Sequence, residues 1–145
     1  MLAIIGGSPA RFAPFSRLFQ QALQTFGRAP LPVGVHSPGY VADTDEQAQE
    51  EFWPRYLEVI RHYSKIRGFA VPTKESFLHE AGPHGALYVG SPETVAQKIA
   101  ANLTALGATR FDLKYGMGGL AHQALMTNIE LYGTQVIPRV RELLA

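Results

Sequence analysis

The chain has 145 residues, of which 46% are hydrophobic and 17% charged, a composition typical of one soluble globular domain rather than a disordered or fibrous protein. A net charge of +1, with both signs scattered along the chain, argues against nucleic acid as a partner. Cysteine is absent, which excludes disulfides and fits a cytoplasmic protein, and no apolar run approaches the roughly 18 residues that a membrane-spanning helix needs.

The first predicted unit is a strand followed by a helix. Residues 2–5 are apolar and end at a Gly-Gly pair. Ser8 then offers a hydroxyl N-cap, with Pro9 at the first helical position, and Gly27 is placed to end the helix. The helix carries one apolar stripe at helical spacing, formed by Phe12, Phe15, Phe19, Ala22 and Phe26.

A second strand is predicted at residues 33–36, and Ser-Pro-Gly breaks the pattern after it. The next helix is expected to open at Asp43, with Glu46 completing a capping box. Phe52, Trp53 and Tyr56 have a spacing that favours core packing over a substrate pocket. Pro54 predicts a kink or a break in this helix, because it lacks the N–H that the preceding turn needs.

Residues 68–85 mix proline, glycine and polar residues without a sustained period, which predicts an insertion loop. A third strand follows at residues 86–89, and Ser91 caps a helix that ends at Gly107. Residues 110–115 form the next predicted strand. A glycine-rich turn then leads into a final helix, with Pro138 as its expected bend.

Strands and helices therefore alternate, which is typical of parallel strands joined by helical crossovers. The pattern supplies about three βα units in a single domain, residues 1–145. A complete (β/α) barrel needs roughly 250 residues, so the sequence predicts only part of one.

Four segments resemble the luciferase-like flavin-dependent monooxygenases, whose fold is a (β/α)8 barrel of the TIM type. They are LAIIGGSPARFAPF (2–15), LPVGVHSPGYVADTDEQA (31–48), GPHGALYVGSPETVAQKI (82–99) and RFDLKYGMGGLAH (110–122). Their order and spacing are those of the family's last three strands with its usual insertion. The resemblance therefore implies an α/β fold that is the C-terminal portion of this barrel, with no counterpart of the N-terminal strands.

The resemblance also implies a function. Family members are oxidoreductases in which a reduced flavin reacts with dioxygen and a small organic substrate is oxidised. FMN is the expected cofactor, and the deazaflavin F420 is the alternative. No catalytic residue is assigned, since most of the family's proposed ones lie on the N-terminal strands. A non-catalytic flavin-binding or structural subunit that self-associates remains the other interpretation, and the expected protein partner is a second copy or the missing N-terminal half-barrel.

Ligands of such barrels bind at the carboxyl ends of the strands. The expected flavin-binding residues are Ile5, Gly6, Gly7, His36, Gly116, Met117, Gly118 and Gly119. The stretch from Gly116 to Ala121 also fits a dinucleotide-binding fingerprint, but no second strand with an acidic end follows it. The histidines show no metal-ligand spacing, so no metal site is predicted.

Overall fold

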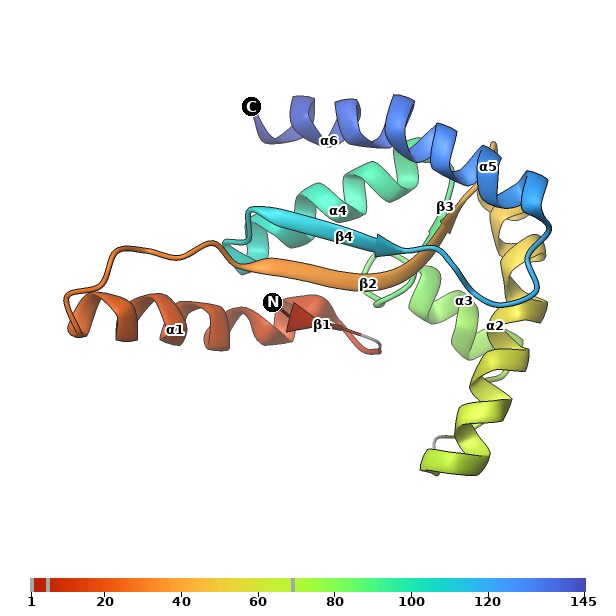
Figure 1. Ribbon diagram of the computed structural model, residues 1–145, viewed down its shortest axis with the longest axis horizontal. Coiled ribbons are helices and arrows are strands. Elements are labelled where there is room, and N and C mark those ends of the chain that lie inside the picture. The colour runs from red at the N-terminus through yellow and green to blue at the C-terminus, as the bar shows by residue number, and fades with distance from the viewer. Residues whose placement is uncertain (1, 5, 69) are drawn as a thin grey trace.

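The computed structural model describes residues 2–4, 6–68 and 70–145. Its elements alternate between strands and helices (Figure 1), which confirms the α/β class. In chain order they are β1 (Leu2–Ala3), the 3-10 turn η1 (Pro9–Phe12), α1 (Ala13–Thr25), β2 (Gly34–Val41), α2 (Asp45–Arg67), α3 (Lys74–Ala81), β3 (Tyr88–Gly90), α4 (Pro92–Leu106), β4 (Arg110–Lys114), α5 (His122–Leu131), the π-helical turn η2 (Tyr132–Val136) and α6 (Ile137–Leu144).

Among the described residues, four parallel strands form one sheet around β2. Val35 and His36 pair with β1 on one edge of β2 and with β4 on the other, so β1 and β4 flank the central strand. The last part of β2, residues 39–41, pairs instead with β3. The parallel strands agree with the predicted crossovers, and β1 and β4 both end beside the middle of β2, at residues 36–38.

The strand β2 is longer than predicted, because it continues through the Ser-Pro-Gly break. In this register the carbonyl of Ile4 would accept a hydrogen bond from the backbone N–H of residue 38, but Pro38 has none. The hydroxyl of the fully buried Ser37 donates to Ile4 O at 2.9 Å instead. A side chain thus replaces the missing backbone donor, and the strand does not have to end at proline.

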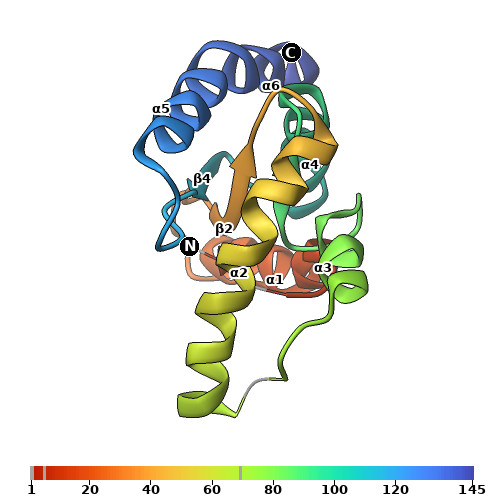
Figure 2. The same ribbon diagram turned by 90° about the vertical axis from the view of Figure 1, so that its right-hand side faces the viewer.

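The helices α1, α4 and α6 cover one side of the sheet, with α4 in the middle (Figures 1 and 2). Val95 and Ile99 of α4 pack with Val136 beneath α6, and Leu106 packs with Ala13 beneath α1. The two outer helices, α1 and α6, therefore stand at the two ends of this helical layer.

A second core lies between β2, α2 and α3. Phe52 is fully buried there and stacks on Tyr40 with ring centroids 5.8 Å apart, while Trp53 and Tyr56 pack around Phe77. The expectation that these aromatic residues of α2 form core is confirmed. Pro54 lies within α2, which continues to Arg67, so the helix is not broken there and the alternative, a kink, stays a prediction.

Three other local predictions were wrong. Residues 68–85 are not simply a loop, because Thr73 and Ser76 form a reciprocal capping box that starts α3 inside them. Thr44, and not Asp43, caps α2, since its hydroxyl accepts from the Gln47 N–H. The Ser8 hydroxyl caps no described backbone N–H, and the chain enters α1 through a 3-10 turn instead.

The predicted caps of α4 are present: Ser91 Oγ accepts from the Thr94 N–H, and Gly107 follows the last turn. The final helix contains the π-helical turn η2 before Pro138 and continues through Pro138 as α6, so the expected bend at Pro138 stays a prediction. None of the described helices is both long and apolar enough to cross a membrane.

Replacing Asp45 with asparagine is expected to lower the free energy of unfolding by about 1 kcal/mol at neutral pH. Burial opposes ionisation, but bonds from Ser91 N–H and the Thr94 hydroxyl hold the pKa of Asp45 below its usual value. This stabilisation is present above the unfolded pKa and is lost as pH falls through the lower folded value. Urea midpoints of both proteins at pH 7 and in acid test this; an equal difference at both pH values would contradict it.

Candidate functional site

The predicted flavin-binding residues lie around the middle of β2, and His36, which was expected to end its strand, lies within it. Gly6 and Gly7 follow β1, and Gly116 to Gly119 follow β4, on opposite sides of this strand. Neighbouring strands lie about 4.8 Å apart, so the two loops leave the sheet roughly 10 Å from each other. Ile5 lies outside the described residues. The sheet therefore brings both glycine loops to the carboxyl edge where barrel proteins bind ligands.

The first loop is held by a carboxylate from the inserted helix. Gly7, whose φ is 72°, donates its N–H to both carboxylate oxygens of Glu80 at 3.1 and 3.2 Å. Glu80 also accepts from the Ala86 N–H at 2.9 Å. One anionic side chain at the end of α3 thus joins the loop after β1 to the chain that enters β3.

Lys98 of α4 fixes the same turn from beneath. Its ammonium group, in a residue only 6% exposed, donates to the carbonyls of Glu80, Ala81, Gly82 and Leu87 over 2.5–3.2 Å. Burial lowers the pKa of Lys98 to about 8, and the charge of Glu80 acts in the opposite direction. The buried cation therefore holds residues 80–87 in place, and with them the carboxylate that contacts the glycine loop.

His36 lies half-buried on the face of the sheet opposite the helical layer. Its register partner on β4 is Asp112, which accepts three hydrogen bonds from Arg110 at 2.9–3.1 Å. Ser37 points to the other face, where it bonds to Ile4, so the two neighbours do not form a nucleophile and base pair. His36, Arg110 and Asp112 thus form a polar row along the open face of the sheet.

The glycine loop after β4 is exposed, except for Met117. Gly116 and Gly118 have no positive φ, and a Cβ added to either would meet no described atom within 4 Å. Met117 is 7% exposed and packs in the core with Tyr40 and Phe52. Its burial does not support the expected role as an adaptable flavin contact, whereas the flanking glycines leave their backbone open to a ligand.

Glu80, Lys98 and Asp112 were missed by the sequence analysis. Glu80 lies in the segment expected to be a loop, and Lys98 interrupts a run of apolar residues that gives no sign of its carbonyl partners. Of these three residues Lys98 lines a hollow of about 750 Å³, which Ser8 and His84 also line. Within the described residues, no three His, Cys, Asp or Glu side chains gather as a metal site would require.

The chain resembles solved structures of monooxygenases. The oxygenating constituent of 3,6-diketocamphane monooxygenase, a type II Baeyer–Villiger enzyme from the CAM plasmid of Pseudomonas putida in complex with FMN, matches 95% of the chain at 20% identity with a TM-score of 0.67. The monooxygenase RslO1 of Streptomyces bottropensis matches 94% at 16% identity with a TM-score of 0.74.

The coenzyme F420-dependent tetrahydromethanopterin reductase of Methanopyrus kandleri matches 95% of the chain at 18% identity, with a TM-score of 0.59. The chain spans 42%, 40% and 45% of the lengths of these three proteins. No family model and no curated protein matches the sequence. The resemblance to luciferase-like flavin monooxygenases is thus confirmed at the level of the fold.

Proposed function

We propose that this chain forms part of a flavin-dependent oxidoreductase of the luciferase-like type and contributes one side of its flavin site. The proposal rests on two glycine loops that follow the carboxyl ends of β1 and β4, on either side of the strand that carries His36. The fold shared with an FMN complex and with an F420-dependent reductase supports it. FMN is the proposed cofactor, with F420 as the alternative, and a small organic molecule is the proposed substrate.

Bound flavin would supply the redox chemistry, while the residues of this chain bind and orient it. The open backbone at Gly116 and Gly118 suits close approach of a planar ring. The imidazole of His36, half-exposed on the strand between the two loops, can donate or accept a hydrogen bond at the flavin rim. The N–H of Gly7 is already bonded to Glu80, so it does not attract an anionic group in this arrangement.

A non-catalytic flavin-binding or structural subunit is the second candidate. It is favoured by one observation, the match to less than half the length of each neighbour described above. We propose further that the chain is the C-terminal portion of a barrel, with residues 68–85 as its insertion, that it acts in the cytoplasm, and that it pairs with a second copy or with the missing strands. Turnover of a reduced flavin with dioxygen by the purified chain would distinguish the enzyme from the subunit.

Replacing Gly118 with valine is expected to weaken FMN binding about tenfold or more while leaving thermal stability unchanged. The branched side chain would stand where the ring must approach, and Gly118 needs no positive φ for folding. FMN affinity is measured by quenching of flavin fluorescence, beside melting temperature. We expect wild-type binding itself to be weak, because few charge-assisted bonds are present for the phosphate.

Gly118→Ala is the matched control, since a single methyl group takes little of the space that valine fills. Its affinity should fall between those of the wild type and the valine variant. Equal FMN affinity in all three proteins would remove this loop from the site, and the absence of quenching at any FMN concentration would remove the flavin proposal itself.

A further inference from the structure

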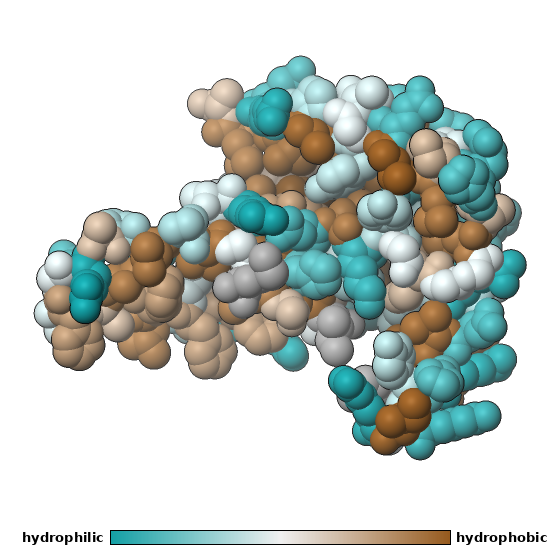
Figure 3. Space-filling model, viewed as in Figure 1, coloured by the Kyte–Doolittle hydropathy of each residue, from teal (hydrophilic) through white to brown (hydrophobic). Residues whose placement is uncertain are grey.

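The outer face of α1 is apolar and has no partner among the described residues. Phe15 is 63% exposed, Leu18 62%, Phe19 43% and Phe26 79%. The helix packs on the body through its small and polar side, where Ser16 donates to Leu106 O at 2.6 Å and Ala13 is buried. Figure 3 shows these apolar side chains along the arm that α1 forms beside the body.

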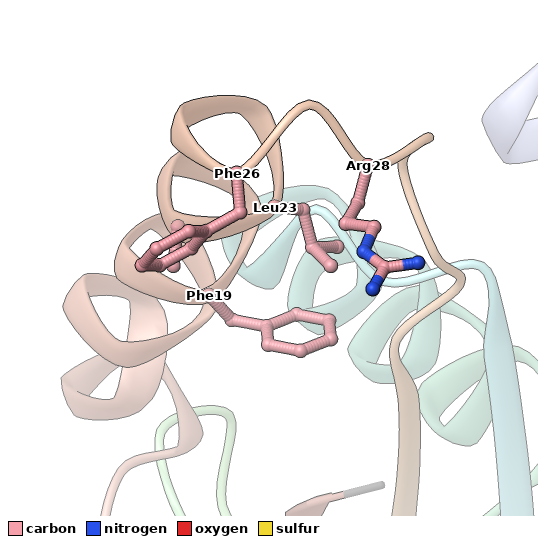
Figure 4. A pocket seen from close by; sticks show the side chains of 5 residues that line it. Phe19, Leu23, Phe26 and Arg28 are labelled. Atoms are coloured by element: carbon pink, nitrogen blue, oxygen red, sulfur yellow. The ribbon is translucent and has the colours of Figure 1, made fainter.

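The apolar area of this face is large enough for an interface with another protein chain. A phenylalanine can bury about 150–250 Å², so the exposed parts of Phe15, Phe19 and Phe26 still offer roughly 350 Å². That matches the largest apolar patches on ordinary monomers, which often mark interfaces. Phe19, Phe26 and Leu23 also line a shallow hollow of about 380 Å³, with Arg28 at its rim (Figure 4). The face thus offers both apolar area and a recess for a partner's side chain.

A second unpartnered apolar face lies at the other end of the helical layer. Met126 and Ile129 of α5 are 47% and 43% exposed, and Leu143 and Leu144 of α6 are 40% and 45% exposed. Since α4 stands between α1 and α6, the helices that carry these two faces lie at opposite ends of the layer. The two outer strands also have free edges, because β1 and β4 each pair with β2 alone among the described residues. Each end of the unit therefore combines an unpaired strand edge with an apolar helix.

We propose that two copies of this chain assemble head to tail, so that α1 of each copy packs on α5 and α6 of the other and β1 of each meets β4 of the other. In each copy β1 and β4 lie on either side of residues 34–38 of β2, while β3 pairs only with residues 39–41. The free edges of β1 and β4 are therefore the ones that the two copies would join. The pairing is two-fold symmetric, because the same two contacts occur at both junctions.

Charge favours the same pairing over contact of α1 with itself. Residues 1–42 contain three arginines and no acidic residue, so two α1 faces would bring like charges together. On the opposite end, the exposed Glu130 follows Ile129 directly and can face Arg17 of the other copy. The ring also places the carboxyl edges of both sheets around one opening, which extends the proposed function by giving the flavin site its second wall.

The test uses two variants of the full chain, Phe15→Glu and Ile129→Glu, with mass measured by light scattering at micromolar concentration. Both side chains are largely exposed, so neither change leaves a cavity, and circular dichroism checks folding. The wild type and the control Gln24→Glu, on the exposed polar side of α1, should have twice the mass of one chain. Each of the two variants alone should be monomeric.

Mixing the two variants in equal amounts should restore dimers, because one junction of the mixed pair then keeps both apolar faces. A monomeric wild type, a chain of larger assemblies, or an Ile129→Glu protein that remains dimeric would each overturn the head-to-tail ring, and the last would point to pairing of α1 with itself. The readout is mass and not flavin, so the assembly can fail while flavin binding survives, and the reverse.

Discussion

Replacing Gly39 with alanine is expected to lower the free energy of unfolding by about 3 kcal/mol or more. Gly39 lies in β2 where the strand passes directly against β3, and an added Cβ would overlap the carbonyl oxygen of Tyr88 and the side chain of Leu113. The carbonyl belongs to the paired backbone, so it cannot move aside without opening the ladder. Urea denaturation followed by circular dichroism measures the loss.

Gly34→Ala is the control in the same strand. There the added methyl group would lie 3.7 Å from the side chain of Arg110, an ordinary contact, so its unfolding midpoint should stay close to that of the wild type. Equal stability of the Gly39 and Gly34 variants would mean that β2 and β3 do not approach each other as closely as described.

Replacing Lys98 with methionine is expected to destabilise the protein by about 3 kcal/mol, because buried carbonyls that lose a donor each cost about 1–3 kcal/mol. The Glu80 and Gly82 carbonyls keep the N–H groups of Leu87 and Gly85 as donors. The carbonyls of Ala81 and Leu87 lose the ammonium bond that the structure gives them. Thermal and urea unfolding measure the change.

The matched control is Lys65→Met on the exposed surface of α2, which removes the same charge without a buried partner. Its unfolding free energy should stay within about 0.5 kcal/mol of the wild-type value. If the Lys98 variant were as stable as this control, the four carbonyl contacts would contribute nothing to the free energy of unfolding.

Much of the fold follows from local signals in the sequence. Ser91 and Gly107 mark the ends of α4 because a side-chain hydroxyl and a left-handed glycine act within one helical turn. The prediction failed where contacts between residues far apart in the sequence determine the structure. The strand β2 continues through Pro38 because the Ser37 hydroxyl donates a hydrogen bond to the carbonyl of Ile4, which lies 33 residues away along the chain. A short helix in residues 68–85 escaped notice because its apolar residues are too few to show a period.

The candidate site was predicted less well than the fold. The structure confirms that both glycine loops follow strands, β1 and β4, as the sequence indicated, while their part in a flavin site stays a prediction. Met117 could not be assigned, since a single apolar side chain in a loop gives no sign of whether it faces a ligand or the core. The link from Lys98 through Glu80 to Gly7 joins three segments of the chain, and no local pattern records it.

The π-helical turn η2 sets the rotation of the last helix. In a straight helix, Ile129, Val136 and Val140 would share one side, because successive residues turn by about 100°. The wide turn carries one extra residue, so α5 is rotated by about that angle relative to α6.

As a result Asn128 takes the buried position, where its Oδ1 accepts the Val41 N–H at 2.6 Å, and Ile129 is turned outward. The Nδ2 of Asn128 has no partner among the described residues. This rotation of the helix therefore costs free energy, because it buries an amide N–H group without a hydrogen bond. If the π-helical turn lay elsewhere along the helix, Ile129 would face the core and the Val41 N–H would lose its hydrogen bond to Asn128. The position of the wide turn thus buries the amide of Asn128 and leaves Ile129 at the surface.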